Sequence, residues 1–263
     1  MKLSVIIPVF KSELIIEELI KKLLVSLDGL SLSFSCAYEV ILINDNGTDE
    51  CWYKIKQLAS KNDKIKGITL DKNYGQHNAV MAGFNYCSGD YIITMDDDLQ
   101  HPPQYIKEII DQLLKGFDVC YTNYVNRKHA FWKHLVSWIN NIISSHLLNK
   151  PYKLYLSSFR GINRSILIQI TKNKKRNIYI DSKILKLSPK ITSIKINHQA
   201  RFQGESTYSF SKLVTLWLNM ASDSSLRPLR FFTFFILIFK LILSLKRKTN
   251  ENLEQFKIKE KTF

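Results

Sequence analysis

The first half of the chain alternates short apolar runs with longer stretches in which apolar residues recur at helical spacing. The apolar runs have the length of β-strands, and the stretches between them have the length of short helices. The predicted strands are 3–10, 38–43, 65–70, 91–95 and 117–121, and the predicted helices are 14–27, 52–58, 79–86 and 104–114. This alternation predicts an α/β fold, with a mostly parallel central sheet and helices on both of its faces.

The second half of the chain is less regular. Its patterns predict helices at 131–148 and 208–221, and strands at 154–162 and 191–197. We therefore divide the chain into three parts. They are an α/β domain at 1–207, an amphipathic helix with a short apolar segment at 208–248, and a polar tail at 249–263 that we expect to be frayed.

The segment 231–245 is apolar at almost every position, with Lys240 as the exception, and basic residues flank it on both sides. At ~1.5 Å per residue, a helix of this length reaches roughly 22 Å, which is less than the ~30 Å hydrocarbon core of a membrane. We expect an interfacial or obliquely inserted helix, or a marginal span. The alternative is a buried helix of the α/β core.

The composition adds a strong positive charge, with a formal net charge of +15 from 38 Lys and Arg against 23 Asp and Glu. Such an excess favours an anionic partner, which is a nucleic acid, a membrane surface or a phosphorylated substrate. No aromatic-interleaved basic motif is present, so we expect no nucleic acid. The four cysteines form no C-x-x-C pair, which fits a reducing cytosol, and residues 1–10 do not resemble a signal peptide.

Three carboxylates, Asp96, Asp97 and Asp98, come directly after the fourth predicted strand. Carboxylates at the end of a buried strand are costly unless a positive charge meets them, and ligands of open α/β sheets bind at this end of the strands. Asp96 and Asp98 are two residues apart and would share a face in extended chain. They predict a site for Mg²⁺ or Mn²⁺ that is completed by substrate phosphates. The alternative is a solvated acidic turn.

Several motifs occur in an order that resembles family-2 glycosyltransferases of the GT-A fold, in the dolichol-phosphate-mannose-synthase-like branch that glycosylates polyprenyl phosphate. Each motif alone is weak, whereas their joint order is specific. The motifs are at 5–10, 43–49, 73–83, 95–103, 157–160, 179–181, 201–209 and 228–230. The similarity extends from about residue 3 to about residue 235.

The resemblance implies a role for each residue that matches a family motif. The metal ligands are Asp96 and Asp98, and the catalytic residues are Asp181 and Asp98. The nucleotide-binding residues are Pro8, Phe10, Glu13, Asp45 and Asp96. The phosphate-binding residues are Gln100, Arg127, Arg160, Arg201 and Lys212. Alternatives remain open, since Asp45 is also suited to cap a helix, the basic residues to a solvated face, and Asp181 to orienting a substrate.

The resemblance implies an inverting, metal-dependent transferase that moves a sugar from a UDP- or GDP-linked donor to polyprenyl phosphate. It would act at the cytoplasmic face of the cell membrane, in the modification of surface polysaccharide or lipid. Many relatives carry two or more spans after the Pro-Leu-Arg motif, and this sequence has one short segment, so we expect a monotopic protein, anchoring as a homo-oligomer, or a form of reduced activity. The alternatives are transfer to a hydroxyl of a growing glycan, with Asp181 as base, and a non-catalytic nucleotide- or nucleic-acid-binding module.

Overall fold

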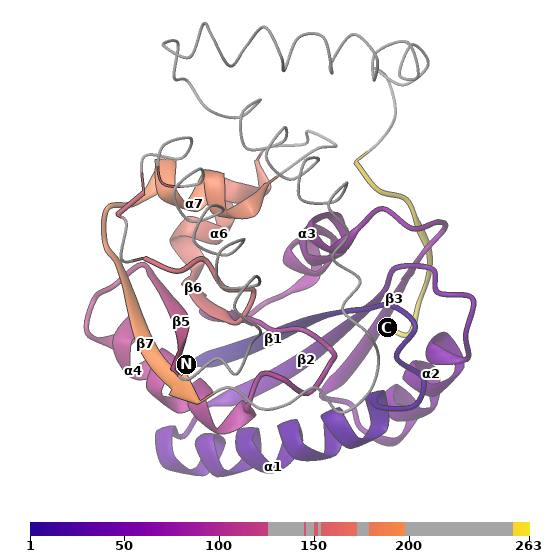
Figure 1. Cartoon of the computed structure of the whole chain (residues 1–263). Helices are drawn as coiled ribbons and strands as arrows, with labels where there is room; N and C mark the ends of the chain where they lie inside the picture. The colour runs from indigo at the N-terminus through magenta and orange to yellow at the C-terminus, as the bar shows by residue number, and fades with distance from the viewer. Residues whose placement is uncertain (126–144, 146–149, 152–153, 173–178, 198–254) are drawn as a thin grey trace, which may run out of the picture.

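The computed structural model describes residues 1–125, 145, 150–151, 154–172, 179–197 and 255–263. The other residues are drawn as a grey trace in Figure 1. Several sequence predictions lie outside the described residues, namely the helices at 131–148 and 208–221, the apolar segment 231–245, Arg127, Arg201 and Lys212.

The described residues form one eight-stranded sheet with the strand order β7-β5-β6-β4-β1-β2-β3-β8 (Figure 1). The four strands at its centre, β4, β1, β2 and β3, are parallel to one another, while β6 and β8 run antiparallel to the strands they pair with. The mostly parallel sheet that the sequence predicts is therefore confirmed. The strands are β1 (Lys2–Val9), β2 (Ala37–Asn44), β3 (Ile65–Leu70), β4 (Tyr91–Thr94), β5 (Val119–Val125), β6 (Arg160–Asn163), β7 (Ile191–Asn197) and β8 (Ile258–Lys261).

Helices cover both faces of the sheet (Figure 1). The helices are α1 (Ile16–Phe34), α2 (Cys51–Lys61), α3 (Gln76–Tyr86), α4 (Ile106–Leu114), α6 (Arg164–Thr171) and α7 (Ile180–Leu187), with a 3₁₀ turn η1 (Pro103–Tyr105) before α4. In Figure 1, α1, α2 and α4 lie below the sheet, and α3, α6 and α7 lie above it. This two-sided cover is what the strand and helix alternation predicts.

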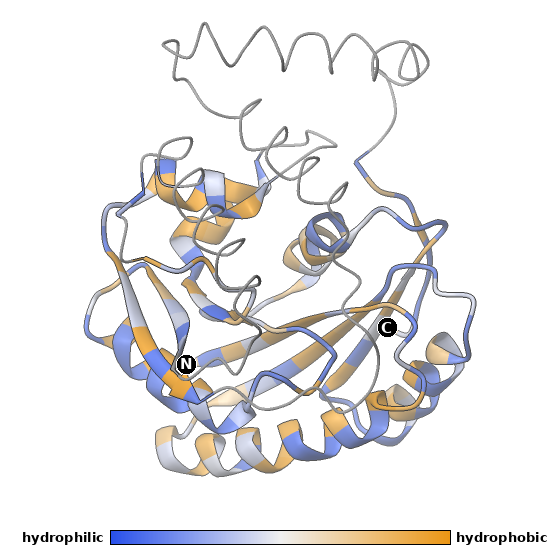
Figure 2. Cartoon of the chain, viewed as in Figure 1, coloured by the Kyte–Doolittle hydropathy of each residue, from blue (hydrophilic) through white to orange (hydrophobic). Residues whose placement is uncertain are grey.

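The alternation of side chains in β1 divides the core into two layers. Leu3, Val5 and Ile7 pack in the cluster that includes α1 and α4, whereas Ile6 packs in the cluster that includes α3, α6 and α7. Successive residues of a strand point to opposite faces, so one buried strand supplies both layers. Figure 2 shows the central strands as largely hydrophobic and α1 as carrying both hydrophobic and hydrophilic positions.

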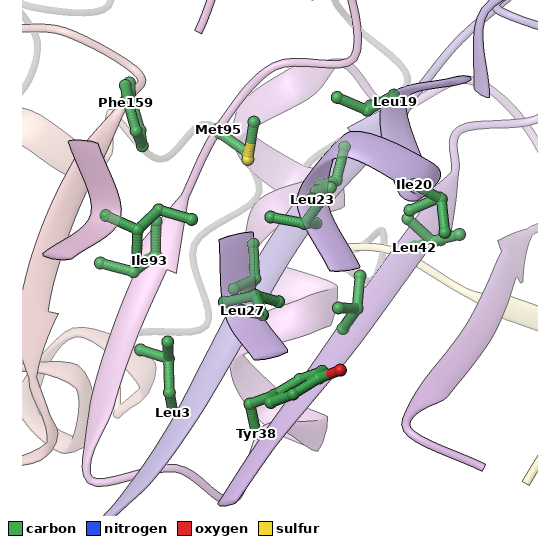
Figure 3. Close-up of a cluster of buried hydrophobic side chains, with 14 of the residues drawn as sticks. Leu3, Leu19, Ile20, Leu23, Leu27, Tyr38, Leu42, Ile93, Met95 and Phe159 are labelled. Atoms are coloured by element: carbon green, nitrogen blue, oxygen red, sulfur yellow. The ribbon is translucent and has the colours of Figure 1, made fainter. Parts of the chain in front are cut away.

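The lower layer is organised by one face of α1. Leu19, Leu23 and Leu27 recur at helical spacing and are fully buried against Leu42 and Ile93 of the sheet (Figure 3). Leu14, which the sequence pattern placed in this helix, lies before its first residue and is 73% exposed. The helix therefore starts later and ends later than predicted.

Two segments differ from the sequence predictions. The predicted strand at 154–162 is ordered as a strand only at its end, where β6 pairs antiparallel with both β4 and β5. The tail that we expected to be frayed instead contains β8, which pairs antiparallel with β3 (Figure 1). The reason is non-local, because the edge of β3 supplies hydrogen-bond partners that the tail sequence alone does not reveal.

Candidate active site at the carboxyl ends of the strands

The parallel register brings the polar turns after the central strands to one edge of the sheet. Val9 of β1 pairs with Asn44 of β2, and Ile6 pairs with Thr94 of β4. The loops that follow these strands carry Phe10, Asp45 and the acidic triplet. This is the edge at which open α/β sheets bind ligands.

Asp96 is held from two sides by residues that are distant in the sequence. Its Oδ1 accepts a hydrogen bond from Nε2 of Gln76 at 2.6 Å, and its Oδ2 accepts one from Oγ of Ser158 at 2.6 Å. Its backbone N–H donates to Nδ1 of His101 at 2.9 Å. The carboxylate is therefore oriented by the start of α3 and by the segment before β6, while it stays partly exposed.

His101 supports Asp96 from a buried aromatic stack. The imidazole is 5% exposed and lies parallel to Phe159, with 5.2 Å between ring centroids, and to Tyr124 at 6.1 Å. Its Nε2 lies 3.8 Å from Oδ2 of Asp96. Sequence reasoning assigned no supporting role to His101 or Ser158, and the only signal for them was their position inside the motifs at 95–103 and 157–160.

Asp98 lies in a tight turn, where its Oδ1 accepts a hydrogen bond from the backbone N–H of Gln100 at 3.1 Å. Leu99 between them has a left-handed backbone with φ 61°, an uncommon conformation for a residue with a branched side chain. Its side chain is buried in the lower core layer, which holds the turn in place. Gln100, predicted to bind phosphate, thus contacts Asp98 through its backbone.

The chemistry of this donor set fits a hard divalent cation. Mg²⁺ is usually bound by one or two protein carboxylates, with the remaining positions taken by water and substrate phosphates. Asp96 and Asp98 supply carboxylate oxygens on one turn, and both side chains are partly exposed. Among the described residues, no group of three or more His, Cys, Asp or Glu side chains is arranged to hold a metal ion.

Asp45 holds the loop between β3 and α3. Its two carboxylate oxygens accept hydrogen bonds from the backbone N–H groups of Tyr74 at 2.7 Å and Gly75 at 2.8 Å. Burial raises the pKa of Asp45 to about 6, although the two hydrogen bonds oppose that shift. The alternative role as a helix cap is wrong, since no side chain caps α2 and Asp45 is bonded to a different loop.

Glu13 joins the loop after β1 to the start of α2. Its Oε2 accepts a hydrogen bond from the backbone N–H of Glu50 at 2.8 Å, and Oδ2 of Asp49 accepts one from the N–H of Glu13 at 3.2 Å. Of the other predicted nucleotide residues, Pro8 is buried inside β1 opposite Ile43, whereas Phe10 is 45% exposed. Phe10 is thus the aromatic surface that this loop presents.

Arg160 and Asp181 are brought together in the interior. The Arg160 guanidinium donates to Oδ1 of Asp181, and the hydroxyl of Tyr121 donates to the same oxygen at 2.7 Å. Arg160 is 3% exposed and Asp181 is 6% exposed. Nε of Arg160 is buried with no hydrogen-bond partner among the described residues. Two residues that the sequence assigned to separate tasks therefore form one buried, charge-balanced pair.

His77 lies in the same region as this pair. Its ring meets the ring of Tyr179 edge to face, with 5.0 Å between centroids. Burial lowers the pKa of His77 to about 4, while the neighbouring charge of Asp181 raises the pKa and that of Arg160 lowers it. The imidazole is therefore neutral at neutral pH.

The sequence is similar to a known protein family and to several named proteins. The family model described as "Glycosyl transferase family 2" matches residues 4–171. The undecaprenyl-phosphate 4-deoxy-4-formamido-L-arabinose transferase of Salmonella choleraesuis is 34% identical over 232 residues, which cover 87% of this chain and 69% of that protein. The protein of the same description from Salmonella paratyphi B is 33% identical over the same shares.

Two solved structures are similar in fold. Glucosyl-3-phosphoglycerate synthase from Mycobacterium tuberculosis, in complex with Mn²⁺, UDP and phosphoglyceric acid, has a TM-score of 0.63 and 17% identity over 87% of this chain and 80% of that one. S. aureus TarS 1–349, in complex with UDP-GlcNAc, has a TM-score of 0.58 and 19% identity over 86% of this chain and 68% of that one. At these identities the likeness concerns the fold alone, and it confirms the predicted GT-A fold.

Proposed function

Because this chain belongs to glycosyl transferase family 2, we propose that it transfers a sugar from a nucleotide sugar to polyprenyl phosphate. The reaction is metal-dependent and inverts the configuration at the anomeric carbon. It serves the modification of cell-surface polysaccharide or lipid. The names of its relatives from Salmonella, which are undecaprenyl-phosphate transferases, support this acceptor. The donor is linked to UDP or GDP.

The observation that carries the proposal is the position of the acidic triplet. Asp96 is oriented by Gln76 and Ser158, and the same triplet contacts the loop after β1 through the backbone N–H of Phe10. A nucleotide sugar has to reach both places, since its base and its diphosphate are joined in one molecule. The loops after β1 and β4 are in direct contact, so one nucleotide can span them.

In the mechanism, Asp96 and Asp98 would hold Mg²⁺ or Mn²⁺, and the cation would supply positive charge that neutralises the departing diphosphate. Phe10 offers its exposed ring to the nucleobase, and Asp45 keeps the neighbouring Tyr74–Gly75 backbone in place. The acceptor phosphate is ionised at neutral pH and needs little help from a base, so positioning and charge neutralisation supply most of the rate.

A sugar hydroxyl would be a different kind of acceptor, because it has to lose a proton as it attacks. Asp181 is the predicted base for that reaction. The contacts of Asp181 favour the phosphate acceptor, because its Oδ1 already accepts hydrogen bonds from Arg160 and Tyr121. We assign Asp181 the role of holding the Arg160 guanidinium in place. The phosphate-binding roles of Arg127, Arg201 and Lys212 stay predictions.

Membrane association belongs to the same proposal. No helix in the described part of the chain combines the length and apolarity needed to cross a membrane. From their sequence, we assign contact with the lipid surface at the cytoplasmic face to the amphipathic segment 208–221 and the apolar segment 231–245. The Lys and Arg residues beside these segments are suited to bind anionic lipid headgroups. Self-association as a homo-oligomer would strengthen such contact.

The test is to incubate membranes that contain the protein with a panel of UDP- and GDP-sugars, polyprenyl phosphate and Mn²⁺, and to identify lipid-linked product by mass. Asp98→Asn and an excess of chelator should each abolish product while the fold is kept. Undiminished transfer in either case would refute the metal role. Transfer to a glycan hydroxyl but not to polyprenyl phosphate would refute the acceptor, and salt-sensitive DNA binding without transfer would refute the enzyme.

A further inference from the structure

Asp97, the middle residue of the acidic triplet, is hydrogen-bonded to the loop after β1. Its Oδ2 accepts a hydrogen bond from the backbone N–H of Phe10 at 3.0 Å and a second one from Oγ of Ser12. Both donors belong to the loop between β1 and α1, which is 87 residues away for Phe10 and 85 for Ser12. One carboxylate therefore connects the metal-binding turn to the loop that presents Phe10.

The β1–α1 loop is also held at Glu13, by its bonds with Asp49 and Glu50, and at Ser12. The carbonyl oxygen of Ser12 accepts from the N–H groups of Ile15 and Ile16, and the N–H of Ser12 donates to Sγ of Cys51. Lys11, between Phe10 and Ser12, has a left-handed backbone with φ 58°. A non-glycine residue in this conformation persists only where its surroundings hold it, and the two bonds to Asp97 lie on either side of it.

We propose that Asp97 is a positioning residue that sets the separation between the nucleobase subsite at Phe10 and the diphosphate–metal subsite at Asp96 and Asp98. The inference rests on the proposed function, because it concerns how a nucleoside diphosphate is held. Such a ligand gains from both subsites at once only when their separation matches its own length. Asp97 therefore affects the binding of a ligand that occupies both subsites, and not of a ligand that occupies only one.

The inference makes a distinctive prediction for Asp97→Ala. Binding of uridine or guanosine alone should stay within about twofold of the wild type, and so should binding of pyrophosphate with Mn²⁺. Binding of UDP or GDP with Mn²⁺ should weaken by about tenfold or more, because the two parts are no longer held at the matching distance. A general loss of structure would weaken all three ligands together.

Matched variants separate this role from others. Asp97→Asn keeps an oxygen that accepts from Phe10 and Ser12, so it should largely restore UDP or GDP binding. Asp111→Ala removes a surface carboxylate on α4 that is bonded to Lys107 and should change none of the affinities. Thermal unfolding of each full-length variant reports folding independently.

The experiment measures the three affinities by calorimetry or ligand-observed NMR for the wild type and each variant. Wild-type protein that binds neither UDP nor GDP with Mn²⁺ would overturn the proposed function itself. Normal wild-type binding, with Asp97→Ala unchanged toward the nucleotide or equally impaired toward pyrophosphate, would overturn the inference alone. Should Asp97→Ala not fold, Ser12→Ala carries the test. It removes one of the two donors, and an unchanged nucleotide affinity there would overturn the inference.

Discussion

Arg160, the first residue of β6, donates a hydrogen bond to Asp181, the second residue of α7, and both side chains are buried. Tyr121 of β5 donates to the same carboxylate oxygen at 2.7 Å. The pair thus joins two strands and a helix in the upper layer. Burying two charges is expensive, and it is tolerated only when each offsets the other and hydrogen bonds satisfy what remains.

Removing one charge of this pair should be more damaging than removing both. We expect Asp181→Asn to lower the free energy of unfolding by about 3–5 kcal/mol, because it leaves the Arg160 cation buried without a counter-charge. The double variant Arg160→Met with Asp181→Leu should recover most of that loss. Urea unfolding of the variants measures both effects. A fully stable Asp181→Asn that is inactive would instead assign Asp181 to chemistry alone.

Because Ser158 helps to orient the Asp96 carboxylate, we expect a substitution at Ser158 to weaken metal binding. Ser158→Ala removes one of the two side-chain hydrogen bonds that orient the Asp96 carboxylate. Loss of such an outer contact typically costs about 10- to 100-fold in metal affinity, so we expect Mn²⁺ binding to weaken by about tenfold. Electron paramagnetic resonance of free Mn²⁺, in the presence of UDP or GDP, measures the change.

The matched control for Ser158 is Ser165→Ala on α6, whose hydroxyl donates to Asn163 at 2.8 Å and is remote from Asp96 in the hydrogen-bond network. It should leave Mn²⁺ binding unchanged. Equal weakening in the two variants would mean that Ser158 contributes general stability and not orientation of the metal ligand.

Periodicity was sufficient to predict the elements that are built locally. The predicted bounds of β3 and β7 coincide with the observed ones, because each is a short segment with recurring isoleucines that follows turn residues. β8 was missed because Lys259, Glu260 and Lys261 carry charges and make no apolar alternation. Its strand conformation comes from pairing with β3. Pairing between such distant segments cannot be recognised from the hydrophobic pattern of either segment alone.

In the candidate site too, the residues of a local motif could be predicted, whereas their partners from distant parts of the chain could not. The position of the acidic triplet at the end of the fourth strand was predictable, because an apolar run marks that strand, and the family motifs include the triplet. The partners of those carboxylates were not predictable, because Ser158 is 62 residues from Asp96, and Phe10 is 87 residues from Asp97. The pairing of Arg160 with Asp181 likewise depends on how α7 packs against β5 and β6.

We expect the ionisation of Glu39 to make the free energy of unfolding depend on pH. This buried carboxylate of β2 accepts hydrogen bonds from Oγ of Ser4 at 2.6 Å, Nζ of Lys66 at 2.8 Å and the N–H of Ser88 at 2.7 Å. Burial alone would raise the pKa, but Lys66 and the other donors outweigh it and lower the pKa of Glu39 from 4.5 to about 2. The ionised form is therefore the one that the fold prefers.

Because the folded pKa of Glu39 lies below its unfolded value, its contribution is complete above about pH 4.5 and is lost as the pH falls toward 2. A shift of this size corresponds to a contribution on the order of 3 kcal/mol. Glu39→Gln should lose that contribution at pH 7 and should differ less from the wild type at pH 2. Urea unfolding across this range tests it. A difference between the two proteins that stays constant with pH would contradict the prediction.

The C-terminal strand β8, yellow in Figure 1, should protect the edge of β3. Nε1 of Trp52 donates to Glu260 at 2.9 Å, and Oγ1 of Thr262 accepts from the N–H of Gly67 at 2.9 Å. Removing residues 257–263 deletes several hydrogen bonds worth about 1 kcal/mol each, so we expect a loss of about 2–4 kcal/mol. It also exposes an unpaired edge, which should promote self-association, measured by light scattering.

Glu260→Gln is the control, because it keeps an acceptor for Trp52 and loses only an exposed ion pair with Lys56 worth about 0–1 kcal/mol. A shortened chain with an unchanged unfolding midpoint and no added association would show that β8 does not stabilise this edge.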